Sequence, residues 1–154
     1  MRTLRLLMVL VTLSLGPSLA MAQGEHVMLG PDDIRWGAAP PSLPRGAMLA
    51  VIEGKPSDPG PFTMRLKFPA GFKVAPHSHP AVEHLTVLSG TLHFGMGDTF
   101  DAGKLAPMRA GSFVVMPVGN PHFVEAREET VIQVHGVGPW GVKYVNPEDD
   151  PSRK

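Results

Sequence analysis

Residues 71–90 read GFKVAPHSHPAVEHLTVLSG, and three of the seven histidines of this 154-residue chain fall within eight positions of this stretch. Neutral imidazoles and carboxylates are good ligands for divalent first-row metal ions. On an extended strand His77 and His79 share one face, and Glu83 begins the next apolar strand with its side chain directed inward. A buried carboxylate is costly unless it is compensated, and a metal ion would remove that cost. The stretch therefore predicts a metal site, and the alternative is a solvated HSHP loop with Glu83 at its rim.

A second stretch favours the metal site over the loop. Residues 111–125 read GSFVVMPVGNPHFVE, in which an apolar strand runs into a turn rich in Pro, Gly and Asn. His122 then begins a returning strand. A hairpin that presents one histidine at its mouth is well suited to supply a fourth ligand to a site made by His77, His79 and Glu83.

The rest of the chain is typical of an all-β protein. Residues 62–68, FTMRLKF, alternate between apolar and polar side chains, as a strand with one buried face does. Gly and Pro number 17 each while 43% of residues are hydrophobic, which favours a turn-rich folded domain over a disordered chain. We find no helical stripe, internal repeat or second domain, so we predict one sandwich or barrel. Further short runs with strand character lie at residues 47–53, 84–88, 91–94, 112–116, 130–135 and 140–145.

The N-terminus has the layout of a secretory signal peptide. Arg2 and Arg5 precede an apolar run that is too short to cross a bilayer of about 30 Å, and AMA before Gln23 resembles a cleavage site. We therefore expect residues 1–22 to be removed, residues 23–46 to form an irregular Pro-rich segment, and the mature protein to be periplasmic or secreted. After cleavage we expect no association with a membrane.

Composition excludes several classes of function. With 14 basic and 14 acidic residues the formal net charge is zero, which gives no reason to expect nucleic acid as a partner. The chain has no cysteine, so disulfides, a thiolate nucleophile and Cys-ligated zinc or iron–sulfur clusters are excluded.

The two stretches together resemble the two motifs of the cupin superfamily. The first has the spacing Gly-x5-His-x-His-x3-Glu-x6-Gly, and the second has Gly-x5-Pro-x-Gly-x2-His. The second motif of the family often continues to an Asn where this chain has Ala126, a position that is not a metal ligand. These motif positions are filled by Gly71, His77, His79, Glu83 and Gly90, and by Gly111, Pro117, Gly119 and His122.

The resemblance implies a single-domain cupin jelly-roll β-barrel over residues 47–147, followed by a C-terminal tail over residues 148–154. It also implies the metal ligands His77, His79, Glu83 and His122, which would hold a divalent ion (Fe, Mn, Cu, Ni or Zn) with one or two positions left open. A homodimer formed through sheet edges is implied as well.

Several functions occur on this fold, so the site must discriminate among them. The leading hypothesis is an exported metal-dependent oxidoreductase of the dioxygenase type that acts on a small organic molecule. The alternative is a non-catalytic module that binds a metal or a small ligand. Metal-free isomerisation or epimerisation is a third option, but it needs an acid–base pair that the sequence does not supply.

Strand parity assigns the remaining side chains. His84 should face away from Glu83, and Gln133 and His135 should point outward because Ile132 and Val134 form the apolar side of their strand. His93 is expected to be structural. Trp140 and Tyr144 either cover a barrel mouth or lie in a subunit interface. Residues read as core are Met64, Leu66, Phe68, Leu85, Val87, Phe113 and Val115.

Overall fold

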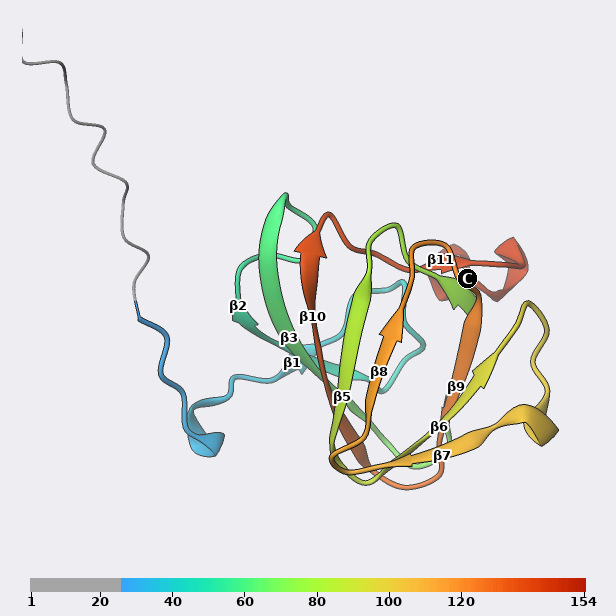
Figure 1. Cartoon of the computed structure of the whole chain (residues 1–154), viewed down its shortest axis with the longest axis horizontal. Coiled ribbons are helices and arrows are strands. Elements are labelled where there is room, and N and C mark those ends of the chain that lie inside the picture. Colours follow the sequence, from blue (N-terminus) through green and yellow to red (C-terminus); the bar gives the residue numbers. More distant parts are fainter. Residues whose placement is uncertain (1–25) are drawn as a thin grey trace, which may run out of the picture.

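The computed structural model describes residues 26–154, which form two antiparallel β-sheets packed face to face (Figure 1). Sheet A has the strand order β1-β2-β3-β10-β5-β8, and sheet B has the order β11-β4-β9-β6-β7. The predicted signal peptide lies outside the described residues. In chain order the strands are β1 (Gly37–Ala38), β2 (Met48–Glu53), β3 (Gly60–Phe68), β4 (Phe72–Ser78), β5 (Glu83–Ser89), β6 (Thr91–Met96), β7 (Ala106–Arg109), β8 (Phe113–Met116), β9 (His122–Ala126), β10 (Thr130–Gly138) and β11 (Lys143–Tyr144), with single 3-10 turns at Pro31–Asp33, Ala102–Lys104, Pro147–Asp149 and Pro151–Arg153.

The all-β prediction is confirmed, but the two sheets are separate hydrogen-bonded ladders that do not close into a barrel. The molecule is therefore a two-sheet sandwich, which is compatible with a jelly roll. Among residues 26–154, no helix is long and apolar enough to cross a bilayer.

The core lies between the sheets and follows the predicted alternation. Every second residue of β3 is at most 4% exposed, beginning with Phe62, and β10 matches it by burying Ile132 and Val134. This arrangement confirms that Gln133 and His135 point outward. On β5, Leu85 and Val87 face the same interior as Glu83.

A bulge turns the two motif histidines into that interior. On β4, Val74 lies opposite Val124 of β9 but His77 lies opposite His122, so β4 carries one extra residue between these pairs. An extra residue reverses the face to which the following side chains point. Val74 and His77 are consequently both buried, although three positions separate them.

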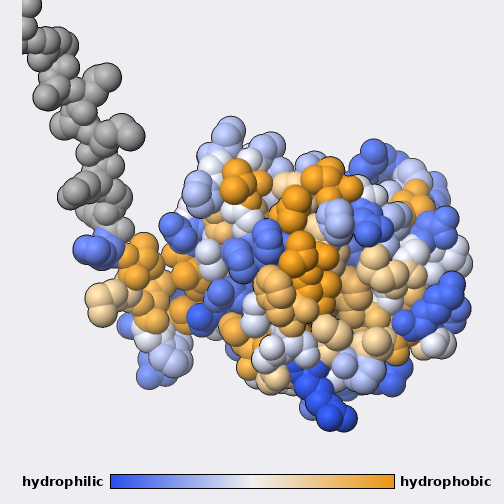
Figure 2. All heavy atoms as spheres, in the orientation of Figure 1, coloured by the Kyte–Doolittle hydropathy of each residue, from blue (hydrophilic) through white to orange (hydrophobic). Residues whose placement is uncertain are grey.

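Phe113 and Val115 do not belong to the core as predicted, because they are 53% and 47% exposed. They lie on β8, an edge strand that pairs Met116 with Glu83 and Val115 with His84. Since Glu83 faces the interior, Met116 does so too, and parity sends Val115 and Phe113 outward. Figure 2 shows apolar side chains gathered in the middle of the face where Figure 1 draws β5 and β8.

The motif glycines have a backbone conformation that favours glycine. Gly71, Gly90, Gly111 and Gly119 all have positive φ, between 72° and 87°. Gly90 joins β5 to β6, and a Cβ there would also overlap the carbonyl oxygen of Glu129. This turn therefore requires glycine for both its conformation and its close packing.

Gly95, near the end of β6, should tolerate no side chain. A Cβ at this position would overlap the ring of Phe123, which is fully buried. We expect Gly95→Ala to lower the free energy of unfolding by about 1–3 kcal/mol, because overpacking forces the ring to move. Urea denaturation measures the change. Gly37→Ala is the matched control, since its Cβ would meet nothing within 4 Å, and equal stabilities of the two variants would contradict this packing.

Candidate metal centre

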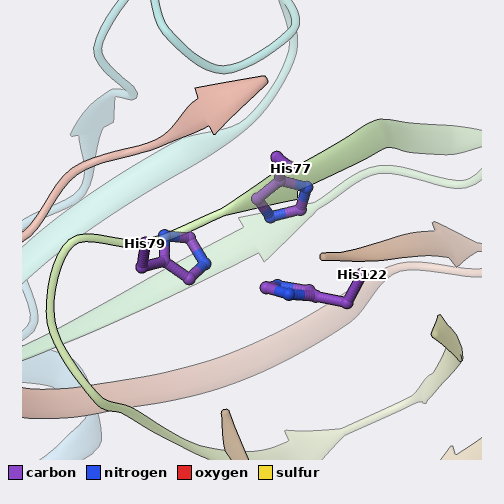
Figure 3. Close-up of side chains that lie close together, drawn as sticks. All are labelled: His77, His79 and His122. Atoms are coloured by element: carbon purple, nitrogen blue, oxygen red, sulfur yellow. The ribbon is translucent and has the colours of Figure 1, made fainter. Parts of the chain in front are cut away.

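Three histidines meet at one end of the interior (Figure 3). His77 lies on β4, His79 follows this strand, and His122 begins β9 as the cross-strand partner of His77. One ring nitrogen of each lies within 4.8 Å of the others, and all three side chains are buried. We call these residues the three-histidine group.

Hydrogen bonds to the backbone fix which nitrogen of each ring is free. The Nδ1 atoms of His77, His79 and His122 lie 2.8, 2.8 and 3.1 Å from the carbonyl oxygens of Ala75, Gly141 and Asn120. A carbonyl oxygen only accepts, so each Nδ1 carries the proton and each Nε2 of the neutral ring presents a lone pair. Within the described chain, the buried Nε2 of His79 makes no hydrogen bond other than its 3.1 Å approach to Glu83 Oε2. Three imidazoles thus offer lone pairs in a form that a metal ion can take.

Each imidazole also rests against an aromatic ring. His79 stacks on Trp140 with a centroid separation of 4.6 Å, and His122 stacks on Phe94 at 5.3 Å. The ring of Tyr144 lies 6.0 Å from that of His77. These contacts restrict the rings in addition to the hydrogen bonds, so the ligand geometry is largely preformed.

Glu83 lies beside the three-histidine group and is not one of its members. Its Oε2 is 3.1 Å from His79 Nε2 and accepts a hydrogen bond of 3.0 Å from Trp140 Nε1. The side chain is buried at the start of β5, as the sequence predicted. Glu83 can therefore serve as a fourth ligand or as a charged partner next to His79.

Burial keeps this site uncharged when no metal is present. It raises the pKa of Glu83 to about 8, and the hydrogen bond from Trp140 opposes this rise. Burial also lowers the pKa of His79 to about 4 and lowers the pKa of both His77 and His122. A divalent cation would reverse the penalty on the carboxylate by supplying the opposite charge. The residues present therefore fit such an ion in both ligand type and charge.

The group lines a small internal cavity of about 30 Å³. That volume holds no more than a few water molecules. Trp140 and Leu43 line this cavity and also a larger groove of about 280 Å³, whose other walls include Pro40, Leu49 and Met64. The groove walls are apolar or bear hydroxyl groups. Because Trp140 and Leu43 line both the cavity and the groove, a molecule that approaches the centre from the groove passes these two residues.

The structure shows where several side chains lie whose positions the sequence did not decide. Trp140 and Tyr144 both cover the centre within one chain, and the Tyr144 hydroxyl donates to the carbonyl of Ser42 at 2.8 Å. His84 faces outward as predicted and stacks on His135 at 4.9 Å. His93 is half-buried on β6 and is not among the cavity residues.

The sequence did not predict that Trp140 and Gly141 hydrogen-bond to residues of the centre. Trp140 lies 57 positions from Glu83, and Gly141 lies 62 positions from His79. A backbone carbonyl leaves no signature in the sequence. An indole near the end of an all-β domain was the one available signal, and it did not distinguish a site residue from an interface residue.

In the metal-free protein, the pH dependence of stability should reflect the titration of the Glu83 carboxyl group. Between pH 4.5 and about 8 the native state keeps a proton on Glu83 that the unfolded chain has lost, so stability falls as pH rises. The lowered pKa values of the histidines act in the opposite direction, but only below pH 6.5. We therefore expect the stability of the metal-free protein to decline from pH 6.5 to 8.

Urea denaturation in a chelator at several pH values measures this decline, and Glu83→Gln should flatten it. Glu125→Gln, a change at a surface carboxylate, is the control and should retain the wild-type slope. Parallel slopes for wild type and Glu83→Gln would show that Glu83 does not hold the proton.

Comparison with known proteins supports the same fold. The family model described as the cupin domain matches residues 64–137. No curated protein matches the sequence. Among solved structures, the polyketide cyclase RemF from Streptomyces resistomycificus is similar with a TM-score of 0.65 and 16% identity, over 86% of this chain and 92% of that chain.

Two further structures show the same likeness. A putative acetylacetone dioxygenase from Methylibium petroleiphilum PM1 has a TM-score of 0.65 and 16% identity over 86% of this chain and 90% of that chain. An RmlC-like cupin from Shewanella frigidimarina NCIMB 400 has a TM-score of 0.57 and 14% identity over 76% and 94%. The family model shows a cupin domain over residues 64–137, and the two-sheet fold and the two motifs with their histidines brought together support the identification of this chain as a cupin.

Proposed function

We propose that this protein binds a divalent first-row metal ion through His77, His79 and His122, with Glu83 as fourth ligand or adjacent charge, and acts as a dioxygenase-type oxidoreductase on a small organic molecule. The observation that carries the proposal is that one ring nitrogen of each histidine lies within 4.8 Å of the others, while each Nδ1 is hydrogen-bonded to a backbone carbonyl. Iron, manganese, copper, nickel and zinc all accept this donor set.

A bound ion of this kind would supply Lewis-acid or oxygen-activating chemistry at the positions that the protein leaves open. The protein's own residues prepare the surroundings. Leucine, valine and phenylalanine side chains from both sheets line the cavity and exclude bulk water. Glu83 offsets part of the cation's charge, and the three carbonyl partners hold the imidazoles in the ligating tautomer.

The substrate is proposed to be small and largely uncharged, because the groove beside Trp140 is lined by apolar and hydroxyl-bearing residues. Acetylacetone, the diketone in the name of one structurally similar protein, belongs to this class. The fold likeness alone does not carry that substrate over to this chain, so the oxygen-uptake experiment below tests diketones alongside other classes.

A second candidate function is a metal- or small-ligand-binding module without turnover. The small size of the cavity favours it, because about 30 Å³ admits no organic substrate unless the covering residues move. The two candidates share the metal site and differ in whether oxygen is consumed.

We also propose that the protein acts outside the cytoplasm and forms a homodimer. The signal-like sequence of residues 1–22 supports the first proposal. The exposed apolar residues Phe113 and Val115 on edge strand β8 support the second, since such an edge is a natural place for association. The N-terminal sequence of the exported protein and its molar mass in solution test the two proposals.

Metal analysis of protein purified without a metal-binding tag tests the site. We expect about one ion per chain in wild type and in His84→Ala, whose imidazole lies on the outer face. In His122→Ala we expect affinity to fall by more than about 100-fold, beyond the loss typical of a change outside the ligand set. Equal metal content in all three proteins, or none even after reconstitution, would contradict the proposed site.

Oxygen uptake by the metal-loaded protein then separates the two functions. Diketones, phenols and oxalate form the substrate panel, and His122→Ala is the negative control. Uptake that requires both the metal and one class of substrate supports the oxidoreductase. Stoichiometric zinc with no uptake for any class would favour the binding module instead.

A further inference from the structure

Trp140 touches two residues of the proposed metal centre at once. Its indole Nε1 donates to Glu83 Oε2 at 3.0 Å, and its ring stacks on His79 with an interplanar angle of 21°. The ring also contacts Phe62, with the centroids 6.1 Å apart. Trp140 thus packs between the core residue Phe62 and the proposed metal centre.

The next residue adds a third interaction. The carbonyl oxygen of Gly141 accepts a hydrogen bond of 2.8 Å from His79 Nδ1. This bond places the proton of His79 on Nδ1 and leaves the lone pair on Nε2, the nitrogen that lies 3.1 Å from Glu83 Oε2. Two consecutive residues therefore set both the tautomer of His79 and the position of the Glu83 carboxylate.

The dipeptide is itself anchored on both sides. The backbone N–H of Trp140 donates to the carbonyl of Pro56 at 2.6 Å, on the loop that follows β2. A few residues later β11 pairs with β4, with Tyr144 opposite His77. A segment fixed at both ends can hold other side chains in place without being displaced itself.

Trp140 and Gly141 lie beyond the stretch that matches the family model, which ends at residue 137. The histidines and Glu83 lie within that stretch. The contacts of Trp140 and Gly141 are therefore a feature of this chain that the matched region does not contain.

We propose that Trp140-Gly141 is a clamp for the metal centre, in which Trp140 is a positioning residue that acts through Glu83. The clamp rests on the proposed metal site. The indole N–H and His79 Nε2 both lie close to Glu83 Oε2, so the indole holds the carboxylate oxygen that lies beside His79. Loss of the N–H frees the carboxylate to rotate away from the position next to His79.

Partners that orient ligands from outside the coordination sphere typically contribute 10- to 100-fold to metal affinity. We therefore expect Trp140→Phe, which keeps an aromatic ring on His79 but has no N–H, to weaken Co²⁺ binding about 10-fold. The ligand-field absorption bands of the bound Co²⁺ should shift as the carboxylate moves. Trp36→Phe is the matched control, because the only other tryptophan lies next to Lys67, away from the centre.

A double-mutant cycle shows whether Trp140 acts through Glu83. In a Glu83→Ala background the indole has no carboxylate to hold, so Trp140→Phe should change Co²⁺ affinity by less than about twofold, the range expected for uncoupled sites. The same 10-fold loss in both backgrounds would overturn the proposal and assign the effect to the packing of His79. No Co²⁺ binding by wild type would instead contradict the proposed metal site.

A measurement on the metal-free protein tests the clamp even if the wild type binds no Co²⁺. The chain has two tryptophans, so its ¹H–¹⁵N spectrum has two indole signals, and Trp36→Phe assigns them. We expect the Trp140 indole proton to exchange slowly with solvent and to exchange faster, with a changed shift, in Glu83→Ala. An indole signal that Glu83→Ala leaves unchanged would overturn the clamp whether or not the protein binds metal.

Discussion

The structure depends on one constraint: three imidazoles are buried with one ring nitrogen of each within 4.8 Å of the others. Each ring donates its Nδ1 proton to a carbonyl, so none can turn its free nitrogen elsewhere without losing that hydrogen bond. The β4 bulge, the start of β9 and the segment after β10 bring these rings together; the turn before β9 is not the hairpin expected from the sequence, because β8 and β9 lie in different sheets. A cation bound by the three ring nitrogens would stabilise this arrangement.

Burial also acts on Glu83, by disfavouring the charged form of its carboxyl group. A carboxylate buried beside Leu85 is disfavoured, and the raised pKa of Glu83 shows that the metal-free site resolves the conflict by keeping the proton. The indole of Trp140 partly offsets the burial through its hydrogen bond. The centre therefore combines a stability cost in the metal-free state with readiness for a divalent ion, a common pattern at functional sites.

The all-β fold and the meeting of the three histidines could be predicted because they follow local rules. Alternation on β3 and β10 fixes which side chains are buried, and the motif spacing predicted that His77, His79 and His122 come together. Phe113 and Val115 were misassigned because the facing of β8 is set by its register against β5, which no local pattern reveals. The closed barrel was wrong for the same reason, since sheet closure depends on pairing between distant strands. Trp140 and Gly141 were missed because their roles arise from tertiary contacts.

The most direct test of the account is anomalous diffraction at the metal absorption edge from crystals of the metal-loaded protein. If the three-histidine group binds the metal ion, we expect one strong peak per chain, within about 2.0–2.3 Å of the Nε2 atoms of His77, His79 and His122. A peak between the outward-facing His84 and His135, or no peak near the three-histidine group, would contradict it.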